Sequence, residues 1–153
     1  MDGAYGVAVW ADGNYVFVTG ANSDSVAVVD VTTKTTPVVR GGVISATYMD
    51  YAWGVAVSPD GNYVFVTGET SDSVAVVDVT TKTSPVVRGG VKSATYMDGD
   101  WEVAVSPDGN YVFVTGHNSD SVAVVDVTTK KGYTTHMFST GTTHVSSPFC
   151  VSE

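Results

Sequence analysis

Aromatic and acidic side chains occur close together at two places in the chain. Asp50 precedes Trp53, and Asp98 precedes Trp101 and Glu102. An indole ring can stack on the apolar face of a sugar, and neighbouring carboxylates can accept hydrogen bonds from its hydroxyl groups. We therefore interpret Asp50, Trp53, Asp98, Trp101 and Glu102 as candidate ligand-binding residues, with a carbohydrate or a protein as the ligand.

Other reactive side chains do not form a recognisable catalytic or metal-binding pattern. The segment from Asp98 to Glu102 holds three carboxylates, which would suit calcium, but it lacks the spacing of a calcium-binding loop. His136, His144 and Cys150 do not have the spacing of zinc ligands. A G-x-S-x-G nucleophile motif and a glycine-rich phosphate loop are also missing from the sequence. We therefore predict no catalytic residue, no metal site and no cofactor.

The overall charge disfavours two classes of partner. The chain carries 16 acidic and 7 basic side chains, a formal net charge of −9. Nucleic acids and anionic membrane surfaces both bind through clustered Lys and Arg. No apolar run approaches the length of about 20 residues that a membrane helix needs. We therefore expect neither nucleic-acid binding nor membrane insertion. Because Cys150 is the only cysteine, no disulfide forms within one chain, and we expect Cys150 to be dispensable for folding.

The chain is organised as a tandem repeat. The sequence DGNYVFVTG begins at Asp12 and returns at equal intervals, at Asp60 and Asp108. Units 1–48 and 49–96 differ at only eight positions, and the third unit keeps the register to Lys130. A repeat of this length indicates that each unit is one supersecondary element that packs on its neighbours. We therefore divide the chain into 1–48, 49–96 and 97–153, of which 131–153 is a divergent C-terminal tail.

Each unit is predicted to form four short β-strands. In the second unit these are 53–57, 63–67, 73–79 and 85–88, all rich in Val, Tyr, Phe and Thr. Ser58 to Asn62 contains Pro-Asp-Gly, which predicts a tight turn. Gly41-Gly42 and Gly89-Gly90 recur without change and are also interpreted as turns.

The predicted third strand is apolar on both faces, so it must be covered on both sides. No segment has the helical periodicity needed to cover it, which leaves sheets packed against sheets. A four-stranded unit of roughly 40 to 50 residues is typical of a β-propeller blade. A β-sandwich and a β-solenoid are the alternatives. We therefore predict an all-β fold, a β-propeller built of three tandem four-stranded blades.

The repeat resembles a known family. Ser58 to Gly68 (SPDGNYVFVTG), followed by Ser73 to Asp78 (SVAVVD), is similar to the YVTN-type β-propeller repeat, and the VVD stretch with Pro85 resembles the LVIVD repeat. The resemblance implies that the first strand of each blade lies at the central channel and the fourth at the rim. It also suggests an extracellular or cell-surface location, although Met1 to Ala4 shows no signal-peptide pattern. Relatives include lactonases, but none of their catalytic residues has a match in this chain.

The differences among the units gather in two loops, and they include Tyr5/Trp53/Trp101, Ala4/Ala52/Asp100, Gly3/Tyr51/Gly99 and Ala21/Glu69/His117. One loop enters the first strand, and the other joins the second and third strands. In an antiparallel meander both loops emerge at the same end of the sheet. Binding residues concentrate on such loops, so we expect this end to be the binding face, whereas neutral drift of loops is the alternative.

The tail has two interpretations. His136-Met137-Phe138 could supply the fourth strand of the third blade, and Phe149 and Val151 fall in register with the start of a further blade. The tail would then lend a strand to close the ring. The alternative is a loosely packed terminal extension.

Three blades are too few to close a ring, because propellers typically contain four to eight. The two end blades should therefore show water an apolar face, which we expect to include Val16, Phe17 and Val28 or their counterparts Val112, Phe113 and Val124. Two chains supply six blades and can close under twofold symmetry. We therefore predict a homodimer that forms one six-bladed ring.

Three functional hypotheses remain open at this point. The first is a non-enzymatic scaffold or interaction module, which binds its ligand through the five residues named at the outset. The second is a propeller hydrolase or lyase, which would require a carboxylate or histidine of perturbed pKa at the channel mouth. The third is a fragment or engineered repeat without a function of its own, because the units are nearly identical.

Overall fold

The computed structural model describes residues 1–128 and the backbone of 134–139. They form twelve strands in three antiparallel sheets of four, each strand beside its neighbour in sequence. The chain order of the first sheet is β1 (Ala4–Val9), β2 (Tyr15–Gly20), β3 (Ser25–Asp30) and β4 (Val38–Ile44). The second sheet consists of β5 (Ala52–Val57), β6 (Tyr63–Gly68), β7 (Ser73–Asp78) and β8 (Val86–Lys92). The third consists of β9 (Asp100–Val105), β10 (Tyr111–Gly116), β11 (Ser121–Asp126) and β12 (Thr134–Ser139). These sheets are called blades 1, 2 and 3 below.

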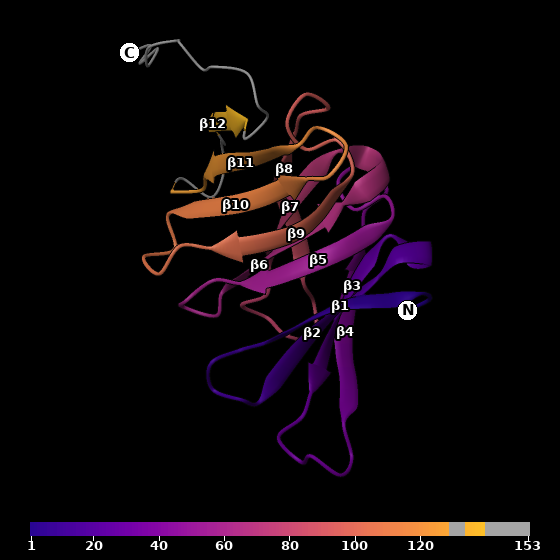
Figure 1. Cartoon of the computed structure of the whole chain (residues 1–153). Helices are drawn as coiled ribbons and strands as arrows, with labels where there is room; N and C mark the ends of the chain where they lie inside the picture. The colour runs from indigo at the N-terminus through magenta and orange to yellow at the C-terminus, as the bar shows by residue number, and fades with distance from the viewer. Residues whose placement is uncertain (129–133, 140–153) are drawn as a thin grey trace.

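The blades follow one another along the molecule, from blade 1 in indigo and purple to blade 3 in orange (Figure 1). The prediction of antiparallel sheets of four strands each is therefore confirmed. The third blade has the fourth strand that one interpretation of the tail expected, because β12 pairs with β11 over its whole length. The expectations for His144, Phe149, Cys150 and Val151 lie outside the described residues.

Helical structure is confined to single turns between the second and third strands. In the described part of the chain these are the 3-10 helices η1 (Ala21–Ser23) and η2 (Glu69–Ser71). Each ends at an aspartate in the left-handed conformation, Asp24 or Asp72. No helix within these residues has the length and apolar character required to cross a membrane.

Two apolar cores hold the three blades together, one at each seam. Between blades 1 and 2, Phe17 and Val28 pack against Val64, Val66 and their neighbours. The same unit positions build the second seam, where Phe65 packs against the face of blade 3. Each seam therefore joins one face of a blade to the opposite face of the next, and both faces of blade 2 are covered.

The expected set of exposed end-face residues was partly wrong. Phe17, Val28 and Val112 are fully buried in the seams, whereas Phe113 is 40% exposed. Successive side chains of a strand point to opposite faces of the sheet, so neighbours such as Val112 and Phe113 cannot share one face. The open face of blade 1 instead carries Val16, Val18 and Ala27, and that of blade 3 carries Tyr111, Phe113 and Val124.

The paired glycines were also misinterpreted, because they lie inside a strand. The fourth strand of blade 2 runs to Lys92 instead of ending at Arg88, and its pairing with β7 contains a bulge at Gly89, where φ is +147°. A side chain at Gly41 of blade 1 would meet the next blade, with its Cβ 2.8 Å from the carbonyl oxygen of Thr83. The glycine pair therefore permits both the bulge and the close approach of the neighbouring blade.

The first strands of adjacent blades are joined by a threonine–glycine contact. Thr19 Oγ1 accepts a hydrogen bond from Gly6 N at 2.7 Å and donates to the carbonyl oxygen of Trp53 at 2.6 Å. A Cβ at Gly6 would lie only 2.2 Å from that oxygen. The contact repeats in the next seam, where Thr67 Oγ1 accepts from Gly54 N at 2.8 Å and donates to the oxygen of Trp101 at 3.2 Å. Both threonines are fully buried.

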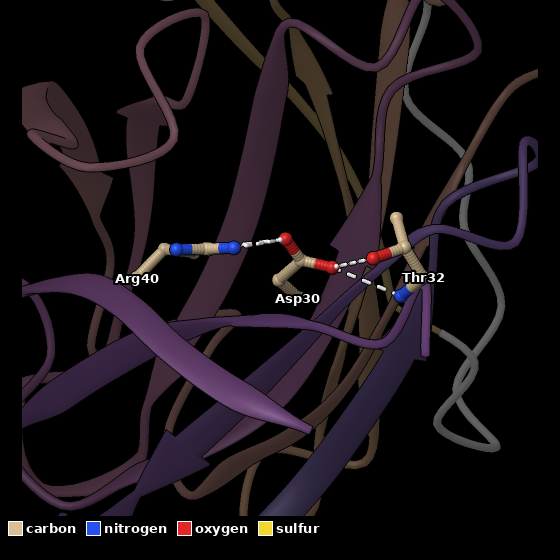
Figure 2. Close-up of polar contacts among 3 residues, drawn as sticks. All are labelled: Asp30, Thr32 and Arg40. Atoms are coloured by element: carbon tan, nitrogen blue, oxygen red, sulfur yellow. Dashed lines mark hydrogen bonds and ion pairs between the residues drawn. The ribbon is translucent and has the colours of Figure 1, made fainter. Parts of the chain in front are cut away.

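A carboxylate near the other end of the sheet ties the third strand to the fourth. Figure 2 shows Asp30 accepting hydrogen bonds from the backbone and hydroxyl of Thr32 and from the guanidinium of Arg40. These contacts lower the pKa of Asp30 to about 2, with the Thr32 hydroxyl as the largest cause. Asp78 repeats the arrangement with Arg88 at 2.6 Å. The ion pair therefore anchors the loop that precedes the fourth strand.

Candidate functional site

The two variable loops of each unit meet at one end of its blade, as the sequence predicts. Ala21 N donates to the carbonyl oxygen of Gly3 at 2.8 Å. The corresponding bond in blade 2 joins Glu69 N to the oxygen of Tyr51 at 3.1 Å, and the bond in blade 3 starts from His117 N. The loop entering the first strand is therefore fastened to the loop between the second and third strands, and both present their side chains at the same end.

An aromatic row crosses all three blades at this end. It consists of Tyr5, Tyr51, Trp53, Trp101 and His117. The ring centroids of Tyr5 and Trp53 are 4.2 Å apart, those of Trp53 and Trp101 are 5.7 Å apart, and those of Trp101 and His117 are 4.2 Å apart. Tyr51 lies beside the first two, 6.2 Å from Trp53. Such separations are those at which aromatic rings stabilise one another.

The threonine–glycine contacts generate the row. They hold the backbones of Trp53 and Trp101 against the first strand of the preceding blade. The residue at position 5 of each unit therefore lies next to the residue at position 5 of the preceding unit. The row has an open side, because Tyr5 is 51% and Trp101 41% exposed. The exposed parts of these rings can contact an apolar surface on a ligand.

Tyr51 occupies a position that favours glycine. Its φ of +57° lies in the left-handed region, where the other two units have Gly3 and Gly99. Such a conformation costs a residue with a side chain about 1 kcal/mol or more. The neighbouring phenol of Tyr5 raises the pKa of Tyr51, and the two ring centroids are 6.3 Å apart. Backbone strain of this kind makes Tyr51 a candidate for the functional site.

The predicted carboxylates lie close in sequence to the two indoles of the row. Asp50 and Asp98 lie in the loops that precede the first strands of blades 2 and 3, and each backbone oxygen accepts a hydrogen bond from the facing loop. Asp98 also accepts from the side-chain amide of Asn118 at 3.1 Å. Glu102 is exposed and directly follows Trp101 on β9. The structure therefore brings Trp53 and Trp101 into one stack and places the acids at the end that this stack occupies.

Asp100 is a buried carboxylate that the sequence did not single out as a site residue. It is fully buried at the unit position where blade 2 has Ala52. Among the described residues, neither of its carboxylate oxygens has a hydrogen-bond partner. Burial, together with the nearby Asp72 carboxylate, raises the pKa of Asp100 to about 8, although neighbouring backbone N–H groups act in the opposite direction. A carboxyl group in this setting is largely protonated at neutral pH.

Three members of the row and Asp100 were missed as site residues. Their signal was present, because Gly3/Tyr51/Gly99, Ala21/Glu69/His117 and Ala4/Ala52/Asp100 are all positions at which the units differ. Sequence differences among the units indicate which end of the blades is variable, but they do not show which side chains contact one another. Within residues 1–128, no three His, Cys, Asp or Glu side chains are grouped so as to hold a metal ion. His136 and its zinc interpretation concern a side chain outside the described part.

Comparison with known proteins supports the propeller architecture. A family model described as "Lactonase, 7-bladed beta-propeller" matches residues 6–153, which is nearly the whole chain. Among curated proteins, no sequence matches the chain.

Solved structures also resemble the chain. A functionally unknown protein from Desulfotomaculum acetoxidans is 19% identical with a TM-score of 0.73, over 89% of this chain and 41% of that one. The hydrazine synthase of Kuenenia stuttgartiensis is 26% identical with a TM-score of 0.71, over 88% and 35%. The periplasmic gluconolactonase of Pseudomonas aeruginosa is 21% identical with a TM-score of 0.67, over 91% and 43%. The chain thus spans about two fifths of the length of these proteins.

Replacement of Asp100 should make the chain more stable in a pH-dependent way. The folded-state pKa lies above that of an exposed aspartate, so the free energy of unfolding falls as the pH rises from about 4 to about 8. Asp100→Ala restores the residue of blade 2 and should raise that free energy by about 2 kcal/mol or more at pH 8, with a smaller gain at pH 4. Urea unfolding at both pH values measures the difference. Asp98→Ala is the control, and an equal gain for Asp100→Ala at both pH values would contradict the assignment.

Proposed function

The chain belongs to the family of seven-bladed lactonase β-propellers, and we propose that it is a non-enzymatic binding module that takes a neutral, polyhydroxylated ligand of the carbohydrate type. The aromatic row is the observation that carries the proposal. It runs across three blades, and the side chains of Tyr5 and Trp101 in it are about half exposed. The exposed parts of these rings offer a sugar apolar contacts along one line.

The charge of the surroundings supports a neutral ligand. Asp98 and Glu102 flank Trp101 in the sequence and can accept hydrogen bonds, and the chain has a net charge of −9. Phosphorylated or carboxylated sugars would be repelled by these groups. Hydroxyl groups, in contrast, can donate to carboxylates while the apolar face of the ring rests on an indole.

Hydrolysis of a sugar lactone is the second candidate function. The family name and the gluconolactonase of Pseudomonas aeruginosa favour it. The observation on this chain is His117, whose imidazole is stacked on Trp101 at 4.2 Å and can accept a proton from water near a ligand held by the row. A lactone is itself neutral and cyclic, so both candidates use the same surface.

We also propose that a second copy completes the ring. The open face of blade 3 carries Phe113 and Val124, the counterparts of residues by which blade 2 fills its seam with blade 3. The open face of blade 1 carries Val16, Val18 and Ala27, the counterparts of the residues that receive them. The two faces are complementary, and two copies supply six blades, one fewer than the family name states.

Glu102 makes the seam between copies different from the seams within a chain. It occupies the position of Gly6 and Gly54, where a Cβ would lie 2.2 and 2.4 Å from the backbone oxygen of the next blade. The first strand of a partner therefore packs further from β9 than β9 does from β5. We further propose that the repeat is of the YVTN type and that the chain acts outside the cell or at its surface, as the sequence resemblance suggests.

Removal of an indole from the row should weaken ligand binding. Trp101→Ala removes the central exposed ring and should weaken binding of a neutral oligosaccharide or of gluconolactone about tenfold or more, because an aromatic anchor contributes about 2 kcal/mol. Calorimetric titration with a panel of neutral sugars and lactones measures this. Trp10→Ala, in a turn at the opposite end of the blade, is the matched control and should bind normally. Equal affinity of Trp101→Ala and the wild-type chain would refute the proposal, and release of acid from the lactone would favour hydrolysis.

Disruption of the open face of blade 3 should prevent self-association. Multi-angle light scattering should give the wild-type chain twice the mass of one 15.9 kDa chain at micromolar concentration. Phe113→Asp places a charge on the open face and should yield a folded monomer. Val86→Asp, at an exposed position on β8, is the control and should leave the mass unchanged. A wild-type monomer that is stable and folded at this concentration argues against the ring.

A further inference from the structure

The open face of blade 1 contains a hollow of about 290 Å³. Its lining includes Met1, Ser25, Ala27, Gly42 and Ile44. The volume is near the lower end for ligand pockets, which suits one side chain better than a whole cofactor. We refer to this hollow as the blade 1 socket.

The equivalent place on blade 2 is filled by a tyrosine. Tyr48 lies in the linker from β4 to β5 and packs against the core of the first seam. A Cβ at Gly90 would lie 2.7 Å from Tyr48 Cδ1, so the phenol ring rests directly on that glycine. Ser73 Oγ donates to the Tyr48 carbonyl oxygen at 3.1 Å, and Lys92 Nζ lies 5.7 Å from the ring centroid.

Blade 3 contacts the linker from β8 to β9 in the same way. Ser121 Oγ donates to the carbonyl oxygen of Tyr96 at 2.7 Å. Tyr96 packs against the core of the second seam. The identical linker sequence Ser-Ala-Thr-Tyr-Met-Asp precedes blades 2 and 3 and delivers both tyrosines.

The groups that hold Tyr48 have counterparts in the blade 1 socket. Ser25 corresponds to Ser73 and Gly42 to Gly90, each one repeat unit earlier in the chain. Ser25 keeps the bond to its neighbouring serine at 2.8 Å, as Ser73 does at 2.7 Å. The one change among these groups is Ile44 in place of Lys92, which removes the cation beside the ring.

From this correspondence we propose that the blade 1 socket binds a tyrosyl side chain presented by an extended segment of another polypeptide. The phenol ring lies on Gly42 beside Ala27, and the hydroxyl of Ser25 donates to the backbone oxygen of the bound tyrosine. No member of the aromatic row lines the socket, so this inference is independent of the proposed carbohydrate binding.

A peptide with the sequence Ser-Ala-Thr-Tyr-Met-Asp, blocked at both ends, tests the proposal directly. Titration into the isotope-labelled full chain should shift the backbone amide resonances of Ser25 and Gly42 by nuclear magnetic resonance. The same peptide with alanine in place of tyrosine should bind at least about tenfold more weakly, as expected when the anchoring ring is lost. The titration is repeated on the Phe113→Asp variant, in which a second copy does not cover blade 1.

Two variants of the socket give opposite results under the proposal. Gly42→Ala places a methyl group where the ring must lie and should reduce affinity about tenfold or more. The new Cβ would lie 3.1 Å from the carbonyl oxygen of Val26, which must shift slightly, so the far-ultraviolet circular dichroism of the variant is recorded to check that the fold is kept. Ile44→Lys restores the cation of blade 2 and should increase affinity about two- to fivefold. Binding that ignores both substitutions, binding that ignores the loss of the tyrosine, or no shift at millimolar peptide in either background overturns the proposal.

Discussion

The contact on which the rest of the molecule depends is the one between a threonine on the second strand of a blade and the first strands of two blades. Thr19 and Thr67 each join a glycine of their own blade to a backbone oxygen of the next. Because the first strands approach so closely that a Cβ would collide, glycine is required at that position. The apolar cores of the two seams then fill the space between the second and third strands of adjacent blades.

This constraint explains how nearly identical units produce a surface that is not uniform. The close approach brings position 5 of each unit into one line, and the differences among units place Tyr5, Trp53 and Trp101 there. In the third unit Glu102 replaces the glycine, so the third blade presents an edge that cannot repeat the contact in the same form. The aromatic row and the interruption of regular packing therefore lie on the same first strands.

Much of this architecture could be predicted from the sequence, because the repeat period and the turn residues are local signals. The strands, their antiparallel order and the end of the blade that carries the variable loops all follow from them. The distinction between Phe17, buried at a seam, and Phe113, half exposed, could not be predicted, because it depends on which face meets a neighbour. The glycine pair was misinterpreted for the same reason. The need for glycine at Gly41 and Gly90 arises from the neighbouring blade or linker that packs on them. Asp100 was missed because its burial arises between two blades, not within one.

The role of the threonine contact is tested most directly by one substitution made at the same position of two different units. Thr67→Val removes the buried bond between blades 2 and 3 and should lower the free energy of unfolding by about 1 to 3 kcal/mol in urea. It should also reduce the near-ultraviolet circular dichroism of the stacked indoles of Trp53 and Trp101. Thr115→Val makes the same change in blade 3, where the exposed threonine accepts from Glu102 N and no further blade follows among the described residues, and should have little effect on either signal. Equal losses of stability in the two variants would contradict the account.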